Sequence, residues 1–271
     1  MTLETHPDLI LGTQDRDRYR VTAELVDVTR PAAPVLAARI AANPQNLLLD
    51  LRKTAIVIID MQNDFCSPDG WMGTLGVDTS RAQALADPIN RVTDCARATG
   101  VPVIWVNWGV RPDRANLAAI TRYPFSDKRA FAGLGAPVVV GGRPHHHLLE
   151  QGGWGAAIID ALAVDSSDIH VDKHRISGFW DTPLDTILRN LQVRTLCFAG
   201  VNSDHCVLGT LMDANFLGYD TVMLEDCVAT TSPDFCHQAA IHNVRFCFGF
   251  TTTSTNLVSG VDAARQSARA G

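Results

Sequence analysis

From Thr54 onward, short apolar runs alternate with amphipathic segments, and this alternation limits the chain to a small set of folds. Six runs have the length and β-branched composition of buried strands, at 54–60, 101–107, 168–173, 195–201, 221–226 and 244–250. Helical patterns separate several of them, at 80–99, 183–191, about 205–217 and 232–243. Strands that alternate with helices form a parallel sheet with both faces covered. The sequence therefore predicts an α/β fold with a doubly wound (Rossmann-like), mostly parallel six-stranded sheet and helices on both faces.

The first 50 residues lack this alternation and are predicted to form an N-terminal extension or arm before a main domain at 51–271. Within the arm, the alanine-rich run 34–42 is expected to form a short helix. Within the main domain, residues 109–154 are rich in Gly, Pro, Arg and His, and their GGRPHHHLL section has no clear strand or helix pattern. Because so long a loop in a compact domain is usually functional, we expect an insertion that acts as a lid or binding loop.

Composition excludes several classes of partner. The net charge is −6 and no run of five basic residues exists, so nucleic acid is not expected to bind. No apolar stretch approaches the ~20 residues of a membrane helix, and the N-terminus has no apolar signal region. The seven cysteines form no CxxC pair, which is typical of reduced thiols in a cytosol. We expect a cytoplasmic homo-oligomer, dimer to tetramer, that acts on a small molecule away from membranes.

Three reactive side chains follow strands of the predicted sheet. Asp60 closes the first strand, Lys173 closes the third, and Cys206 follows the fourth. Because the ligand crevice of an open α/β sheet lies at the carboxyl ends of its strands, we expect them to meet there. Cys206 also stands where a helix begins, and a helix start and a nearby ammonium both lower a thiol pKa. With an aspartate to take the proton, these are the parts of an activated thiol nucleophile.

Other interpretations remain open on residue type and spacing alone. A strand-ending aspartate is often a turn cap, a lone lysine is often solvated, and a cysteine among apolar residues is often a small core residue. A non-catalytic binding protein that kept the fold is therefore one alternative. A dinucleotide-binding enzyme is another, but the turn after the first strand, DMQNDF, lacks the GxGxxG that cradles a pyrophosphate.

Three segments resemble the signature segments of the isochorismatase-like cysteine hydrolases. They are IIDMQNDF (58–65), DKHRISGF (172–179) and GVNSDHCV (200–207), and their order and spacing match that family from about Thr54 to Phe250. Three motifs in register make a specific resemblance, whereas any one alone is weak. The resemblance implies a doubly wound hydrolase domain and an enzyme that needs no cofactor.

The resemblance also implies the roles of the reactive residues. It makes Asp60, Lys173 and Cys206 a catalytic triad. It further implies a non-prolyl cis peptide at Val201–Asn202, which would aim the N–H groups of Asn202 and Cys206 at a developing oxyanion. The implied reaction is thiolate attack on an amide or ureido carbonyl, loss of ammonia to leave a thioester, and hydrolysis by a water that Asp60 activates.

The substrate class follows from finer resemblances. Residues 177–189 are most similar to ureidoacrylate amidohydrolases, while 64–66 and 110–113 are similar to biuret hydrolases; N-carbamoylsarcosine amidase is a further relative. We therefore expect hydrolysis of a C–N bond in a small carbamoyl or ureido compound, such as ureidoacrylate, biuret or an N-carbamoyl amino acid. The alternatives are another small carboxamide, such as nicotinamide or maleamate, and a non-catalytic binding protein.

Residues just past the strand ends are candidates for substrate binding. Aromatic, amide and guanidinium groups there can stack on a planar ureido group, pair with its N–H and C=O groups, or clamp a carboxylate. The candidates are Phe65, Asn107, Trp108, Arg111, Phe179 and Trp180, with Trp71 and Arg114 beside them. No metal is expected, because NWGVRPD after the second strand lacks the Asp/His pattern of nicotinamidases. The consecutive residues His145, His146 and His147 are expected at the surface or in a lid, since neighbouring loop residues rarely converge on one ion.

Overall fold

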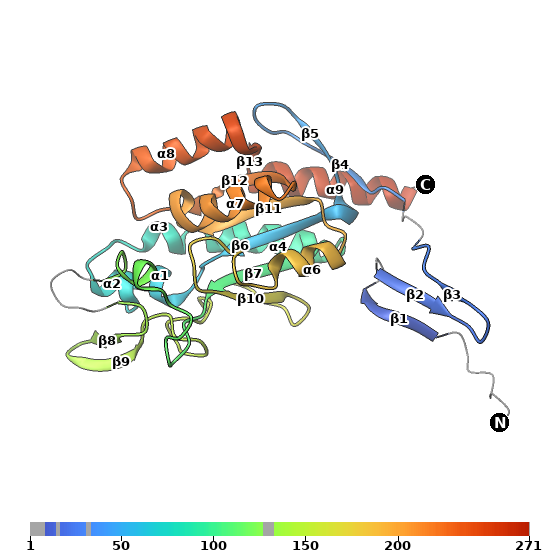
Figure 1. The fold of residues 1–271 in the computed structure, drawn as a ribbon. Coiled ribbons are helices and arrows are strands. Elements are labelled where there is room, and N and C mark those ends of the chain that lie inside the picture. Colours follow the sequence, from blue (N-terminus) through green and yellow to red (C-terminus); the bar gives the residue numbers. More distant parts are fainter. Residues whose placement is uncertain (1–8, 15–16, 31–33, 127–132, 271) are drawn as a thin grey trace, which may run out of the picture.

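The computed structural model describes residues 9–14, 17–30, 34–126 and 133–270, and a six-stranded parallel sheet forms its centre (Figure 1). In spatial order the strands are β10 (Ile169–Lys173), β7 (Val103–Trp108), β6 (Thr54–Ile59), β11 (Thr195–Val201), β12 (Asp220–Ala229) and β13 (Phe250–Thr252). Counted along the chain this order is third, second, first, fourth, fifth, sixth, which is the doubly wound arrangement. The predicted fold class is confirmed.

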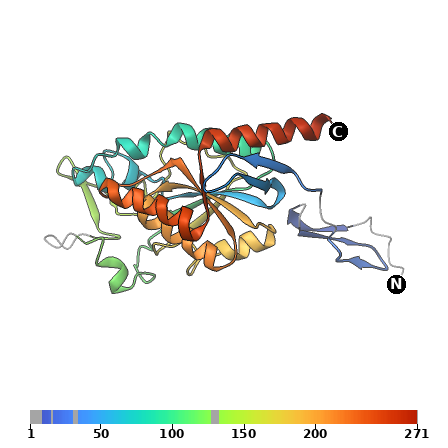
Figure 2. The ribbon, with the colours of Figure 1, turned by 90° about the horizontal axis from the view of Figure 1, so that it is seen from above.

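Helices cover both faces of the sheet, as the two views show (Figures 1 and 2). The long helices are α4 (Ala86–Arg97) and α9 (Ser254–Ala270) on one face, and α6 (Leu184–Asn190), α7 (Leu208–Phe216) and α8 (Asp234–Asn243) on the other. Because both faces are covered, all six residues of β6 are buried and its sequence is apolar after the first threonine. Within the described part of the chain, no helix is long and apolar enough to cross a bilayer.

The site is placed by the connections of two neighbouring strands, β6 and β11. The chain leaves β6 toward β7 on one side of the sheet and leaves β11 toward β12 on the other. Such a topological switch point opens a crevice at the carboxyl ends of the strands. Asp60 follows β6 directly, and Cys206 lies in the π-helical turn Ser203–Val207 that follows β11. Strand order alone therefore brings these two residues to the same crevice.

The 109–154 insertion contains regular structure that its sequence did not reveal. It holds the short helix α5 (Ala119–Arg122) and an antiparallel hairpin of β8 (Pro137–Val140) and β9 (Arg143–His147). The GGRPHHHLL section, for which no strand was expected, thus includes β9, because pairing with β8 supplies the backbone hydrogen bonds that its composition does not favour. Residues 127–132 of the insertion lie outside the described residues.

Short elements connect β6 to α4. They are the single-turn helices α1 (Asn63–Cys66), α2 (Trp71–Thr74) and α3 (Ser80–Gln83). A 3-10 turn (Leu51–Lys53) comes directly before β6. The helix expected at 80–99 is present as α3 followed by α4. Because α1 and α2 follow Asp60 within a few residues, their side chains lie beside the crevice.

The N-terminal arm forms strands rather than the expected helix. In its described part, β1 (Leu9–Gln14), β2 (Asp17–Val21) and β3 (Val26–Asp27) make an antiparallel sheet that stands apart from the main domain, while β4 (Ala37–Ile40) and β5 (Leu47–Asp50) form a hairpin (Figure 1). Residues 1–8, 15–16 and 31–33 lie outside the description.

The helix predicted at 34–42 is wrong because burial in this segment follows a period of two. Ala38 and Ile40 are buried in the core beside α9, whereas Ala37 and Arg39 are exposed. A strand puts alternate residues on one face, so tertiary packing outweighs the helix propensity of alanine here.

The sixth strand is shorter than its apolar run suggested. Val244–Phe248 forms a π-helical turn that continues α8, and β13 begins only at Phe250. Gly249 separates the two with φ of 149°, a backbone conformation that side chains disfavour, and its N–H donates to Val244 O at 2.8 Å. Phe246 in the turn is 79% exposed, so this apolar part of the sequence does not form a buried strand.

Gly200 in β11 offers a test of how tightly the switch point is packed. Its φ is 107°, and a Cβ added there would stand 2.0 Å from Ile59 O of the neighbouring strand. Gly218 has a similar φ of 87° with open space around it. Gly218→Ala is expected to lower the free energy of unfolding by about 1 kcal/mol, and Gly200→Ala by about 2–4 kcal/mol, because the clash adds to the backbone cost. Urea denaturation measures both, and equal losses would contradict this packing.

Candidate active site

Asp60 is a buried carboxylate at the end of the central strand. It is 1% exposed, its N–H donates to Val106 O at 3.0 Å, and its φ of 54° lies in the left-handed region that aspartate tolerates better than most residues. Among the described residues, neither carboxylate oxygen accepts a well-aligned hydrogen bond, and Lys173 Nζ approaches Oδ2 at 2.9 Å as an ion pair. Burial raises the pKa of Asp60, and the charge of Lys173 opposes this.

Lys173 is completely buried and connects the other two residues of the group. Its Nζ lies 2.9 Å from Asp60 Oδ2 and donates to Cys206 Sγ at 3.5 Å and to Arg175 O at 3.1 Å. The same nitrogen stands 4.2 Å from the ring centroid of Trp108, in cation–π geometry. A buried ammonium is stable only when it is paired and hydrogen-bonded. These contacts provide that pairing, so the ends of β6, β7, β10 and β11 meet around one charge.

Cys206 is 5% exposed and keeps its proton in the resting protein. Burial and the charge of Asp60 raise the pKa of the thiol to about 12, while Lys173 and Trp108 oppose the rise. The expectation of a lowered thiol pKa, drawn from the helix start, is therefore wrong for the resting protein, because desolvation outweighs the helix dipole. A protonated thiol now stands beside a carboxylate whose own pKa is raised, which is a suitable arrangement for proton transfer from sulfur to oxygen.

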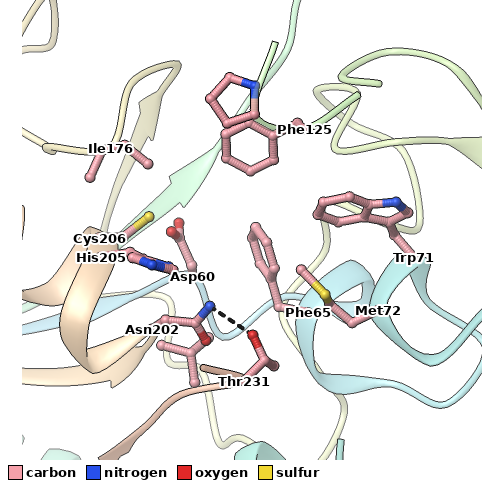
Figure 3. A pocket seen from close by; sticks show the side chains of 12 residues that line it. Asp60, Phe65, Trp71, Met72, Phe125, Ile176, Asn202, His205, Cys206 and Thr231 are labelled. Atoms are coloured by element: carbon pink, nitrogen blue, oxygen red, sulfur yellow. Dashed lines mark hydrogen bonds between the residues drawn. The ribbon is translucent and has the colours of Figure 1, made fainter. Parts of the chain in front are cut away.

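A cavity of about 270 Å³ opens onto Asp60 and Cys206. One part of its wall is apolar and largely aromatic, and the rest is polar. The lining residues are Asp60, Phe65, Trp71, Met72, Pro124, Phe125, Ile176, Val201, Asn202, His205, Cys206 and Thr231. Figure 3 shows Asp60 and Cys206 on one side of the cavity and Trp71 and Met72 on the other. A volume of this size fits a small molecule at the lower limit of ordinary ligand pockets.

The peptide bond between Val201 and Asn202 is cis, as the resemblance of the sequence implied. Both residues line the cavity, directly before the turn that carries Cys206. The side chain of Asn202 donates to Thr231 Oγ1 at 3.2 Å, so it is tied to the segment after β12 (Figure 3). The backbone at the end of β11 is thereby brought to the cavity wall beside the thiol.

Gln62, two residues after Asp60, holds the end of β7 in place. Its Nε2 donates to Trp108 O at 2.8 Å and to Ala156 O at 2.7 Å, and its Oε1 accepts from Trp108 N at 2.9 Å. Gln62 is fully buried, so these bonds lie in a dry environment where they are strong. Sequence reasoning missed this residue, although it lies inside the DMQNDF segment and a buried glutamine there could only be a hydrogen-bonding group.

Asp64 joins the insertion to the cavity wall. Its side chain is fully buried and accepts hydrogen bonds from Trp71 N at 3.0 Å and from Leu149 N at 2.8 Å. It also pairs with His146 Nε2 at 2.5 Å. The His146 side chain is 4% exposed, so it does not lie at the surface, whereas the His147 side chain is 51% exposed. The lid location, the other expectation for these histidines, stays a prediction. One carboxylate thus fixes both β9 and the start of α2, which carries Trp71.

The structure does not place a metal-binding cluster among the histidines. His146 points to Asp64, and His147 points to Glu150, with 3.4 Å between His147 Nδ1 and Glu150 Oε2. His145 Nδ1 is 2.8 Å from His146 Nδ1, a contact between rings rather than a shared open site. In the described ranges, no group of three or more His, Cys, Asp or Glu side chains is arranged to hold an ion.

One of the six predicted binding residues lines the cavity, and the assignment of two others to substrate binding is corrected. Phe65 lines the cavity, with its ring edge toward Trp71 at 6.5 Å between centroids. Asn107 and Trp108 are 8% and 1% exposed and are not among the lining residues, so they lie behind the wall rather than against a bound molecule. Trp108 also packs edge-on against Phe125 at 5.1 Å.

The other three predicted binding residues lie elsewhere, and their assignment to the pocket is corrected. Arg111 is more than half exposed and its guanidinium forms two bonds to Asp113, at 2.9 and 2.6 Å. Phe179 packs in the core against Tyr219, with 6.0 Å between centroids. Trp180 is 61% exposed and donates to Asp213.

The wall residues that sequence reasoning did not find come mainly from distant segments. They are Met72, Pro124, Phe125, Ile176, His205 and Thr231. Arg114, which lies within the insertion, does not line the cavity and donates to Gly135 O at 2.6 Å. The position of a residue just after a strand does not indicate which parts of an insertion fold back onto the cavity. His205 was the exception, since it adjoins Cys206 within the GVNSDHCV segment.

The fold and site define a class of α/β proteins that hold an aspartate, a lysine and a cysteine together at the switch point of a doubly wound sheet. Residues 54–256 match the isochorismatase domain, and the chain belongs to the isochorismatase family. It is 35% identical over 212 residues to ureidoacrylate amidohydrolase RutB of Azorhizobium caulinodans, a match that covers 78% of this chain and 92% of that protein.

Solved structures with a similar fold include two hydrolases. A cysteine hydrolase from Pseudomonas syringae pv. phaseolicola 1448A matches with a TM-score of 0.64 and 26% identity, over 86% of this chain and all of that one. N-carbamoylsarcosine amidase from Thermoplasma acidophilum matches with a TM-score of 0.56 and 26% identity, over 74% and 96% of the two chains. The N-terminal arm lies outside the family match, which begins at residue 54.

The pair formed by Asp64 and His146 is testable by removing one partner. His146→Ala leaves the fully buried carboxylate of Asp64 with one hydrogen-bonding partner fewer, so the free energy of unfolding is expected to fall by about 2–3 kcal/mol. His147→Ala, on the adjacent exposed residue, is the matched control and is expected to change stability by less than about 0.5 kcal/mol. Urea denaturation of both variants measures the difference; indistinguishable midpoints would mean that His146 does not anchor the hairpin.

Proposed function

We propose that this chain is a cysteine amidohydrolase that cleaves a C–N bond of a small carbamoyl or ureido compound through a thioester and releases ammonia. Its family and its relatives named ureidoacrylate amidohydrolase make it a hydrolase of carbon–nitrogen bonds other than peptide bonds. The observation that carries the finer proposal is the contact of one buried ammonium with both a carboxylate and a thiol at the cavity floor.

The first step moves a proton and forms a bond to carbon. The thiol proton of Cys206 passes to Asp60, and the sulfur attacks the carbonyl carbon of the bound substrate. The carbonyl oxygen becomes an oxyanion, which the N–H groups of Asn202 and Cys206 are proposed to stabilise. Support for this comes from the cavity lining, which includes both Asn202 and Cys206.

The second step expels the leaving group, and the third restores the enzyme. Asp60 returns the proton to the departing nitrogen, the C–N bond breaks, and ammonia leaves a thioester on Cys206. A water that gives its proton to Asp60 then attacks the thioester, and the acid is released with the thiol re-formed. Lys173 stays charged throughout, since it pairs with the Asp60 carboxylate at rest and with the thiolate after proton transfer.

The cavity wall supports a small planar substrate. Phe65, Trp71 and Phe125 give it aromatic faces, and Asn202 and Thr231 give it hydrogen-bonding groups close to the thiol. A ureido group is planar and carries both donors and acceptors, so it uses both kinds of wall. The proteins named RutB and N-carbamoylsarcosine amidase, to which this chain is similar, act on compounds with such a group according to their names. The aromatic faces also favour a planar carboxamide such as nicotinamide as a second candidate.

His205 replaces Arg111 as the proposed partner for a substrate carboxylate. No lysine or arginine is among the lining residues of this cavity in the described chain, whereas His205 lines it with a half-exposed side chain. Its Nε2 lies 3.3 Å from Asp204 Oδ2. Although burial opposes the effect, hydrogen bonds from Thr230 and Ser232 lower the pKa of Asp204, so its carboxylate stays ionised beside the imidazole.

Removal of the nucleophile tests the proposed function. Ammonia release from ureidoacrylate, biuret, an N-carbamoyl amino acid, nicotinamide and butyramide is measured with the wild type, with Cys206→Ser and with the control Cys247→Ser, which changes an exposed thiol. We expect at least one ureido compound to be hydrolysed at least ~100-fold faster in kcat/KM than butyramide. Cys206→Ser is expected to lose at least ~1000-fold in kcat, and Cys247→Ser to lose nothing. Ammonia release that survives Cys206→Ser would refute the mechanism; equal rates on butyramide would refute the carbamoyl specificity.

The role of His205 is tested with a charged and an uncharged substrate. His205→Asn is expected to raise KM about 10-fold for ureidoacrylate, which has a carboxylate, and less than twofold for uncharged biuret. Arg111→Ala is the control and is expected to leave both KM values unchanged, because its guanidinium is already paired with Asp113 outside the cavity. A rise in KM for ureidoacrylate in Arg111→Ala, with none in His205→Asn, would contradict this assignment.

A further inference from the structure

Trp108 carries a buried donor without an acceptor. Its Nε1 is inaccessible and has no hydrogen-bond partner among the described residues. Such groups are rare in folded proteins and costly, so each one needs a physical explanation. A bound substrate does not supply the missing acceptor, because Trp108 is 1% exposed and is not part of the cavity lining.

The position of the indole is fixed from three sides. Gln62 bonds both the N–H and the C=O of the Trp108 backbone. The edge of the ring contacts Phe125, and Lys173 Nζ stands over its face at 4.2 Å. The same Nζ reaches Cys206 Sγ, so the indole and the sulfur are neighbours of one ammonium. The ring is also close enough to the sulfur to lower the pKa of the thiol, although no aligned hydrogen bond joins them at rest.

We propose that Trp108 is a positioning residue whose indole N–H donates to the sulfur of Cys206 once that sulfur becomes a thiolate. The inference rests on the proposed function, because it assigns the partner that holds the nucleophile in its reactive form. A neutral thiol is a weak acceptor, whereas a thiolate is a strong one. The donor is therefore unused in the resting protein and used after proton transfer.

Charge and protons balance in this step. At rest the group holds the Asp60 carboxylate, the Lys173 ammonium and the neutral Cys206 thiol. The proton leaves Sγ for Asp60, and the S–H electron pair stays on sulfur, so the group then holds a neutral carboxylic acid, the same ammonium and a thiolate. The net charge is zero in both states. Negative charge moves from oxygen to sulfur, and Lys173 and Trp108 are the two donors that face its new position.

Trp105 provides a matched control on the same strand. It is also fully buried, and its Nε1 donates to Asp168 Oδ2 at 2.8 Å on the far side from the site. Trp105→Phe and Trp108→Phe each remove one indole N–H from β7. Only Trp108→Phe removes a donor from the sulfur, so any difference in thiol chemistry between the two variants reports that donor.

The experiment measures alkylation of Cys206 by iodoacetamide, followed by peptide mass spectrometry because the chain has seven cysteines. Between about pH 7 and 9, far below the thiol pKa of about 12, the rate follows the thiolate fraction and rises with pH. Trp108→Phe is expected to lower this rate about 10-fold at every pH and to lower kcat similarly with KM within twofold. Trp105→Phe is expected to keep the wild-type rate. Because phenylalanine is smaller than tryptophan, easier access would raise the rate, not lower it.

Equal alkylation rates in the two variants would overturn the proposal. If Trp108→Phe does not fold, site-specific replacement of Trp108 by 3-benzothienylalanine keeps the ring shape and replaces only the N–H with sulfur. A wild-type alkylation rate in that protein would equally overturn the role of the donor. The alkylation rate needs no substrate, so failure of the proposed function appears separately, as a wild type that releases no ammonia from any ureido compound.

Discussion

The structure around the site depends on one buried charge, the ammonium of Lys173. A charge removed from water is tolerated only when nearby groups replace its hydration, and no single strand provides enough of them. Asp60 comes from the end of β6, Trp108 from β7, Arg175 from the segment after β10, and Cys206 from the turn after β11. The ammonium therefore requires four chain segments to end at the same place, and the place that meets this requirement is the switch point of the sheet. In the proposed mechanism the same ammonium has a second role, since the charge that pairs with the carboxylate at rest would also stabilise a thiolate on Cys206.

A second requirement is met by the turn that follows β6. Gln62 and Asp64 are fully buried polar residues there, and each needs several partners. Gln62 finds them on the backbone at the end of β7, and Asp64 finds them on α2 and in the insertion, through His146. The short segment that follows β6 thus connects the end of β7 to the cavity wall and to the insertion. The insertion belongs to the site for this reason, although in sequence it is only a long segment between two strands.

The limits of prediction follow from the range over which each signal acts. Strand positions were predictable because a buried strand is apolar at every residue, as in 54–59. The segments 34–42 and 244–250 were misassigned because their local composition fits both a helix and a strand. Packing against α9 makes the first a strand, and continuation of α8 makes most of the second a π-helical turn. Phe65 was placed correctly since it follows Asp60 within one turn. Phe179 and Arg111 were misplaced since strand-end position does not say which way a side chain turns.

The sequence by itself determined the doubly wound sheet and the meeting of Asp60, Lys173 and Cys206 at one edge of it, because strand order and motif spacing are encoded locally and in register. Only the tertiary structure decided the protonation state of the thiol and the composition of the cavity wall. Burial raises the pKa of Cys206 even though its position at a helix start lowers it, and burial is a property of everything packed around a residue. The wall likewise combines side chains such as Phe125 and Thr231 that are distant in sequence, so no local sequence pattern predicts that they line the same pocket.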